Sequence, residues 1–168
     1  FLRGAIGSIL YYVYEFLPGN SRRWETRMSE ARPKQFVAVF DFGAQYGQLI
    51  ARRVRDLHVY SEIVPCDISA DELAKMAPSA IILSGGPASV YAEGAPDMDA
   101  RVFELGIPIL GFCYGEQIMA VKLGGEVAHT DKGEYGPATL TRLGSSVLLD
   151  GTPEGGQTVW MSHRDSVS

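Results

Sequence analysis

Short apolar runs that alternate with segments of helical pattern constrain the fold of this chain more than any other feature. The first run, Phe-Val-Ala-Val-Phe-Asp, has too few polar side chains for a strand that faces water on one side, and it is typical of a parallel sheet buried on both faces. The apolar runs cover residues 36–41, 59–65, 80–84 and 108–111, and the helical patterns cover residues 45–57, 70–76, 97–105 and 115–123. Since strands alternate with helices, we expect an α/β fold in which helices flank a mostly parallel sheet.

Local signals support some of these elements and add others. Ser69 with Glu72 three residues later is the pattern of a capping box at the start of a helix. Two further strand-like pieces, at residues 138–143 and 158–161, are separated by glycine-rich turns.

Composition and charge exclude several classes of function. A net charge of −5 argues against binding to nucleic acid, which needs clustered Lys and Arg. The charged stretch at residues 52–56 is typical of a solvated helix face. The apolar run at residues 5–13 is shorter than the roughly 20 residues that a membrane helix needs. With two cysteines, Cys66 and Cys113, and three isolated histidines, the chain has neither a disulfide framework nor metal-ligand spacing. We therefore expect a cytoplasmic protein with no metal, nucleic-acid or membrane partner.

The first 35 residues differ from the rest, and we treat residues 1–35 as a leader and residues 36–168 as the domain. Met28 opens a short polar stretch before the first strand, so we expect residues 1–27 to be read-through upstream of a start at Met28. A genuine extension and a damaged secretory signal are the alternatives.

The pentapeptide Gly-Phe-Cys-Tyr-Gly at residues 111–115 is the strongest chemical signal. A nucleophile on a sharp strand-to-helix turn needs small residues two positions to either side, because Cβ atoms there would clash. Such a turn places the sulfur of Cys113 at a helix N-terminus, where unpaired amides favour the thiolate. The alternative is a buried structural cysteine, but a core cysteine has no need of the flanking glycines.

The turn Gly85-Gly86, which follows Ser84, is the second signal. In parallel α/β sheets the chemistry lies at the carboxyl ends of the strands, so the exits after Ser84 and Leu110 should share one edge. The amide of Gly86, together with that of Tyr114, could then form an oxyanion hole. The alternative is a tight turn without a ligand.

The segment Met-Ser-His-Arg-Asp at residues 161–165 is the third signal. His163 is a candidate base for Cys113, and Asp165 is a candidate ligand for a substrate amine. Both are equally compatible with a surface loop that follows a strand.

Five motifs together resemble the class I glutamine amidotransferase domain of the GMP synthase family, whose fold is flavodoxin-like. They lie in order along residues 36–168 and read DFGAQYGQLIARRVRD (41–56), ILSGGPASVY (82–91), GFCYGEQIMAVKLGG (111–125), EYG (134–136) and VWMSHRD (159–165). The resemblance implies that Cys113 attacks the side-chain amide of glutamine to give a glutamyl thioester, while the amides of Gly86 and Tyr114 stabilise the oxyanion. The residues that it implies for holding the amino-acid end of glutamine are Gln117, Ser162 and Asp165.

For the complete protein, the resemblance implies conversion of XMP to GMP with ammonia from glutamine. A C-terminal ATP pyrophosphatase domain would receive the ammonia and would use ATP and Mg²⁺, and the full-length protein would be a homodimer. The present chain itself would carry no cofactor.

Three departures from the family pattern matter. Glu116 stands where an uncharged residue is usual, and Arg164 replaces a glycine, which would distort a loop that needs a positive φ. The His-Pro-Glu motif of the family's base and the phosphate loop of the synthetase do not occur in the sequence. We therefore expect a C-terminally truncated domain with little or no glutaminase activity alone. The alternatives are a non-catalytic glutamine-binding module and a flavodoxin-like scaffold in which Cys113 senses redox state.

Overall fold

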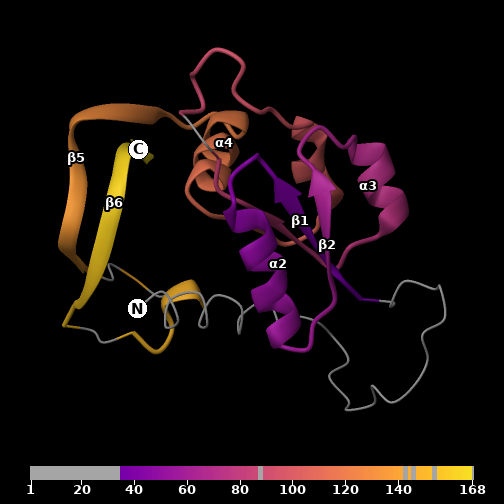
Figure 1. Cartoon of the computed structure of the whole chain (residues 1–168), viewed down its shortest axis with the longest axis horizontal. Helices are drawn as coiled ribbons and strands as arrows, with labels where there is room; N and C mark the ends of the chain where they lie inside the picture. Colours follow the sequence, from indigo (N-terminus) through magenta and orange to yellow (C-terminus); the bar gives the residue numbers. More distant parts are fainter. Residues whose placement is uncertain (1–34, 87–88, 142–143, 145–146, 153–154, 168) are drawn as a thin grey trace.

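A four-stranded parallel sheet forms the centre of the structure. The computed structural model describes residues 35–86, 89–141, 144, 147–152 and 155–167. The strands of the sheet are β1 (Val37–Asp41), β2 (Ser61–Pro65), β3 (Ala80–Leu83) and β4 (Ile109–Gly111), in the order β2-β1-β3-β4. The helical elements around it are α2 (Tyr46–Asp56), α3 (Ala70–Met76), the 3₁₀ helix η1 (Ala100–Leu105) and α4 (Tyr114–Lys122) (Figure 1). Among the described residues, no helix has the length and apolar character needed to cross a membrane.

Both faces of the sheet are covered, which explains the apolar character of its strands. On β1, Val37 and Val39 pack in a cluster with Ile50 and Val54 of α2. Ala38 and Phe40, which alternate with these valines along β1, point to the other face of the sheet. There they join a larger cluster with residues of α3, η1 and α4. Burying a side chain of this size contributes about 1.5–3 kcal/mol. The predicted α/β fold, a mostly parallel sheet flanked by helices, is confirmed.

Helix α3 begins as its sequence predicts. The Ser69 hydroxyl accepts a hydrogen bond from the Glu72 amide at 3.3 Å, and the Glu72 carboxylate accepts one from the Ser69 amide at 3.2 Å. This reciprocal pair is the capping box, and it satisfies amides that would otherwise lack a partner at the helix start.

The helix predicted at residues 97–105 begins three residues later than predicted, and it is the 3₁₀ helix η1. Asp99 sets this start, because its backbone is extended and its carboxylate accepts hydrogen bonds from two amides. One oxygen accepts from the Arg101 amide at 3.0 Å, and the other accepts from the Ala70 amide at 2.9 Å. The side chain that starts η1 therefore also holds the start of α3.

The C-terminal region forms an antiparallel ribbon of its own rather than short strands. Strands β5 (Val127–Leu140) and β6 (Gln157–Val167) pair only with each other and lie beside α4 (Figure 1). The piece predicted at residues 158–161 is therefore too short, and the piece predicted at residues 138–143 begins too late and runs past the end of β5, with residues 142–143 outside the described part of the chain. Partner pairing extends these strands through polar and glycine-containing stretches, where side-chain alternation gives no signal.

Candidate active site

Cys113 lies at a strained turn between a strand and a helix. Strand β4 ends at Gly111, α4 begins at Tyr114, and Cys113 between them has φ 49° and ψ −111°. A non-glycine residue in this region costs about 1–3 kcal/mol and persists only when its surroundings enforce it. The amides of Glu116 and Gln117 donate to the Cys113 carbonyl at 3.0 and 3.1 Å, so the first turn of α4 holds the elbow. The side chain of Cys113 is exposed.

The two glycines that flank Cys113 are required by close packing. A Cβ atom on Gly111 would lie 2.7 Å from the backbone nitrogen of Glu116. A Cβ atom on Gly115 would collide with the carbonyl oxygen of Leu83 on the neighbouring strand. The spacing of small residues predicted this crowding correctly.

The paired glycines after β3 lie against this elbow. Strands β3 and β4 are parallel neighbours, with Leu83 opposite Gly111, so their exits share one edge as predicted. A Cβ atom on Gly85 would lie 3.9 Å from the Cβ of Cys113, and one on Gly86 would lie 2.5 Å from Cγ of Tyr114. The structure therefore brings together the predicted nucleophile and the two residues predicted to supply oxyanion donors.

The surroundings of Cys113 keep it protonated. Loss of hydration among the packed atoms of the elbow raises the pKa of its thiol, and the Glu116 carboxylate raises the pKa further. The helix N-terminus acts in the opposite direction. Although the side chain has exposed surface, the thiol therefore does not ionise by itself near neutral pH.

Other predicted site residues fall into two groups. Gln117 lies one turn after Cys113 on α4 and is partly buried beside the elbow. Ser162 and Asp165 lie in β6, paired with Tyr135 and His129, and their side chains lie outside the described part of the structure. Their roles as substrate ligands therefore stay predictions.

The segment that carries His163 belongs to strand β6 and not to a loop. His163 pairs with Glu134, and Asp165 pairs with His129, so the pairing is irregular opposite Arg164. The side chains of His163 and Arg164 also lie outside the described residues. The role of His163 as a base and the distortion expected from Arg164 therefore stay predictions.

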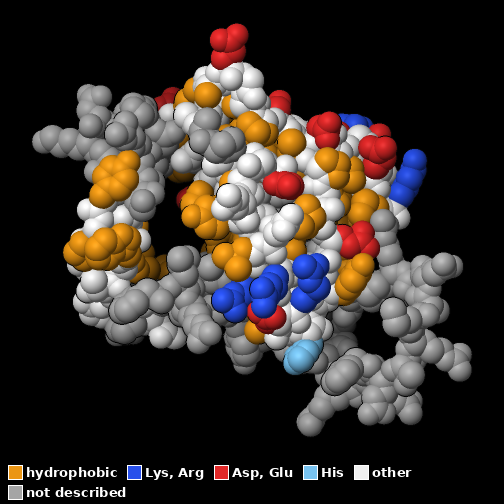
Figure 2. Space-filling view, in the orientation of Figure 1, with side chains coloured by type: hydrophobic (Ala, Val, Ile, Leu, Met, Phe, Trp, Pro, Cys, Tyr) orange, Lys and Arg blue, Asp and Glu red, His pale blue; other side chains and the backbone are white. Residues whose placement is uncertain are grey.

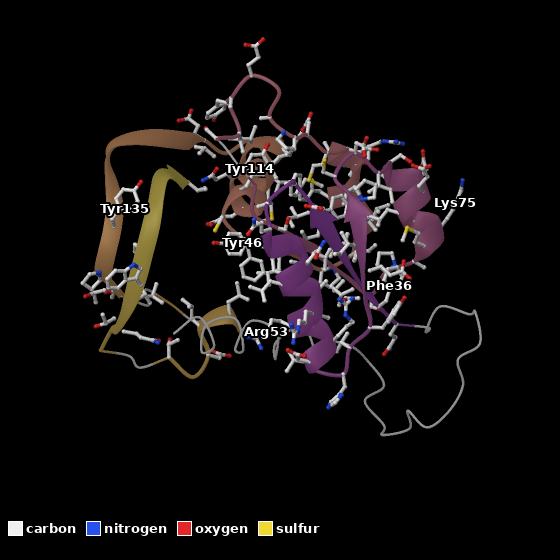
Figure 3. All side chains as sticks on the ribbon, viewed as in Figure 1. Phe36, Tyr46, Arg53, Lys75, Tyr114 and Tyr135 are labelled. Atoms are coloured by element: carbon white, nitrogen blue, oxygen red, sulfur yellow. The ribbon has the colours of Figure 1, made fainter. Side chains whose placement is uncertain are left out.

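Two residues near the site make contacts that the sequence did not predict, although Ser84 was named there as the residue before the glycine turn. Tyr46 begins α2, is 61% exposed, and its ring reaches within 3.8 Å of the Cβ position of Gly85 (Figure 3). Ser84 is fully buried; its hydroxyl donates to the Gly85 carbonyl at 3.1 Å and accepts from the Phe42 amide at 3.4 Å. The sequence did contain a signal for Tyr46, because this residue follows the carboxyl end of β1. In parallel α/β sheets, functional residues gather at the carboxyl ends of the strands.

No group of three or more His, Cys, Asp or Glu side chains is arranged to hold a metal ion in the part of the chain that the structure describes.

Comparisons with known proteins assign this fold to a family. Residues 38–168 match the profile of the family described as glutamine amidotransferase class-I, so the chain belongs to the class I glutamine amidotransferases. It is 57% identical over 132 residues to the glutamine-hydrolyzing GMP synthase of Thermobifida fusca, which covers 79% of this chain and 25% of that protein. It is 55% identical over 131 residues to the enzyme of the same name from Aquifex aeolicus, covering 78% of this chain and 26% of that protein. The chain thus spans about a quarter of the length of these relatives.

Solved structures give the same grouping. A Thermoplasma acidophilum protein assigned to GMP synthase superposes with a TM-score of 0.66 at 29% identity, covering 82% of this chain and 68% of that one. A glutamine amidotransferase from Methylobacillus flagellatus has a TM-score of 0.53 at 19% identity, with coverage of 80% and 57%, and this likeness concerns the fold alone.

Proposed function

We propose that this chain is the glutamine-hydrolysing part of a GMP synthase, which supplies ammonia for the conversion of XMP to GMP in purine biosynthesis. The observation that carries the proposal is the exposed Cys113 thiol at a strained elbow, with the Gly85-Gly86 turn packed against that elbow. Membership of the family supports glutamine as the ammonia source. The identity of 57% to the Thermobifida fusca enzyme supports XMP as the acceptor.

In the proposed reaction, the sulfur of Cys113 attacks the carboxamide carbon of the glutamine side chain, and the C–N bond breaks as ammonia leaves. Water then attacks the glutamyl thioester, the C–S bond breaks, and glutamate and the free thiol are released. The amides of Gly86 and Tyr114 stabilise the oxyanion in both steps. Loss of one such donor typically lowers kcat by about 10²–10³.

The thiol needs a base in this scheme. Because the pKa of Cys113 is raised by loss of hydration and by Glu116, a base must accept its proton and return it to the leaving ammonia. In the complete protein we assign this role to the histidine of a His-Pro-Glu motif, which the present sequence does not contain.

Binding of substrate and partners extends the proposal. Gln117, Ser162 and Asp165 would hold the amino-acid end of glutamine, with the Asp165 carboxylate facing the substrate ammonium group. The ammonia would pass to an ATP pyrophosphatase domain that uses ATP and Mg²⁺, in a cytoplasmic homodimer. The present chain contributes no residue to the ATP or Mg²⁺ sites in this scheme.

Labelling with an electrophilic glutamine analogue, 6-diazo-5-oxo-L-norleucine, tests the proposal at an alkaline pH that ionises the Cys113 thiol without the base that the present sequence lacks. We expect mass spectrometry to find the adduct on Cys113, and we expect excess glutamine to slow its formation. Cys113→Ser should abolish the adduct, whereas Cys66→Ser, which removes the other free cysteine, should leave it unchanged.

The alternatives give different results in the same experiment. Glutamine binding without an adduct would indicate a non-catalytic glutamine-binding module. A Cys113 thiol that reacts with peroxide but ignores both glutamine and the analogue would indicate a redox sensor. Either result would overturn the proposed function.

A further inference from the structure

The side chain of Tyr114 lies under the glycine turn and is almost completely enclosed. It is 2% exposed, and its ring packs against Phe42 with 5.2 Å between the ring centroids. A Cβ atom on Gly86 would lie 2.5 Å from Cγ and 2.9 Å from Cδ2 of this ring. The backbone of Gly86 thus rests directly on the aromatic ring, and only glycine fits there.

The hydroxyl of Tyr114 reaches the segment that follows the glycine turn. It donates a hydrogen bond to the carbonyl oxygen of Pro96, 18 residues before it in the chain. Burial, and next the nearby Asp97 carboxylate, raise the pKa of the Tyr114 hydroxyl, so the hydroxyl stays protonated and remains a donor at neutral pH. One side chain therefore contacts the segment between β3 and η1 at Gly86 and at Pro96.

The same segment is tied down at two further points that lie away from the glycine turn. Lys122, at the end of α4, forms an ion pair of 2.6 Å with Asp97. The Tyr91 hydroxyl accepts a hydrogen bond from the Val127 amide at 3.3 Å, at the start of β5. These contacts provide matched controls, because they anchor the same segment without touching Gly86.

From this arrangement we infer that the Tyr114 side chain is a positioning residue, which sets the place of the Gly86 amide relative to Cys113. Tyr114 would then act twice in the proposed oxyanion hole, once through its own amide and once as the support of the second donor. The role in an oxyanion hole rests on the proposed function, whereas the support of the Gly86 backbone by the Tyr114 side chain rests on the contacts alone.

Three variants of the 168-residue chain separate the contribution of the Tyr114 ring from that of its hydrogen bond to Pro96 and from general anchoring of the segment. Tyr114→Leu removes the ring beneath Gly86 and the bond to Pro96, whereas Tyr114→Phe removes only the bond. Tyr91→Phe is the control, because it deletes a hydroxyl contact of the same segment away from Gly86. A urea denaturation curve for each variant shows that it is folded, and if Tyr114→Leu does not fold, Tyr114→Phe alone decides.

The first measurement is the ¹⁵N order parameter of the Gly86 amide. We expect a value near the ~0.85 of rigid backbone in the parent chain and in Tyr91→Phe, a lower value in Tyr114→Phe, and a value towards ~0.6 in Tyr114→Leu. The second measurement, at the same alkaline pH, is the rate of Cys113 labelling by the diazo-oxonorleucine analogue divided by the rate with iodoacetamide, which needs no oxyanion hole. Loss of one hydrogen bond should lower this ratio about two- to tenfold in Tyr114→Phe, and Tyr114→Leu should lower it further.

An unchanged order parameter at Gly86 and an unchanged labelling ratio in the Tyr114 variants would overturn the inference. Equal changes in Tyr91→Phe would overturn it as well, because they would assign the effect to general anchoring of the segment. Failure of the proposed function looks different: the parent chain would not react with the glutamine analogue, while the order parameter of Gly86 would still report the support by Tyr114.

Discussion

Cys113 is subject to opposing electrostatic influences that all come from its own turn. The dipole at the N-terminus of α4 favours the thiolate, whereas loss of hydration and the Glu116 carboxylate favour the thiol. Glu116 is exposed in the first turn of the helix, where a carboxylate suits the helix dipole. This residue therefore stabilises the helix start and at the same time makes the neighbouring Cys113 thiol harder to ionise.

Glu116→Gln should lower the pKa of Cys113, because it removes the negative charge that opposes the thiolate. The pKa should stay above its ordinary value, since loss of hydration is the larger cause. The pH dependence of alkylation by iodoacetamide measures this, and the curve should move to lower pH. Glu126→Gln, an exposed charge beyond the other end of α4, is the control and should not move the curve. A shift to higher pH in Glu116→Gln would contradict the argument.

Gly115→Ala tests the packing of the elbow, because its new methyl group would meet the carbonyl of Leu83. We expect a loss of about 1–3 kcal/mol in the free energy of unfolding, measured by urea denaturation, since backbone must move to make room. Gly155→Ala is the matched control, with no atom within 4 Å of the new methyl group. A free energy of unfolding that is equal in the two variants would show that the elbow tolerates a larger residue.

At the scale of elements, the junction of α3 and η1 depends on one carboxylate. Hydrogen bonds from the Arg101 guanidinium and from the amides of Ala70 and Arg101 lower the pKa of Asp99 from 3.8 to about 2. The two elements lie far apart in sequence but start from the same side chain. No periodicity in the sequence reports such a shared cap.

The lowered pKa of Asp99 predicts a loss of stability in acid. A carboxyl group whose pKa is lower in the folded than in the unfolded state stabilises the fold above its unfolded pKa, near 3.8, and this contribution disappears as the pH falls towards about 2. Asp99→Asn keeps a cap but cannot titrate, so the urea midpoint of this variant should fall less steeply across that range. Glu104→Gln, on the same 3₁₀ helix, should behave like the parent chain. Parallel curves for Asp99→Asn and the parent chain would contradict the assignment.

At the scale of the whole molecule, the parallel sheet and the ribbon differ in how they bury apolar surface. The sheet hides apolar side chains on both faces, whereas the ribbon exposes Tyr135 at 64% and Trp160 at 76%. Figure 2 shows apolar side chains on the outer arm formed by β5 and β6 and basic side chains gathered over α2. The ribbon register places Pro137 opposite Trp160, two positions along the ribbon from the Tyr135–Ser162 pair, so the exposed rings share one face.

Trp160→Thr should therefore reduce self-association without weakening the fold. Threonine suits a strand, and a change at an exposed site usually alters the free energy of unfolding by less than about 0.5 kcal/mol. Light scattering over a concentration series measures the association, and urea denaturation checks the stability. Unchanged scattering would show that the exposed ring does not promote association.

The sequence alone determined the parallel sheet and the glycine-flanked turn that carries Cys113, because both depend on local chemistry. Apolar runs need burial on two faces wherever they lie, and Gly-x-Cys-x-Gly needs small residues wherever a chain turns sharply from strand to helix. The capping box of Ser69 and Glu72 was readable for the same reason, since its partners are three residues apart.

The tertiary structure decided the features that join distant parts of the chain. Packing of Tyr114 beneath Gly86, capping of α3 by Asp99 and the full length of the β5–β6 ribbon all depend on contacts between segments that no local pattern connects. Such contacts depend on how the elements are arranged in three dimensions. For that reason the sequence could predict that Cys113, Tyr114 and Gly86 lie close together, but not that the Tyr114 ring packs against Gly86.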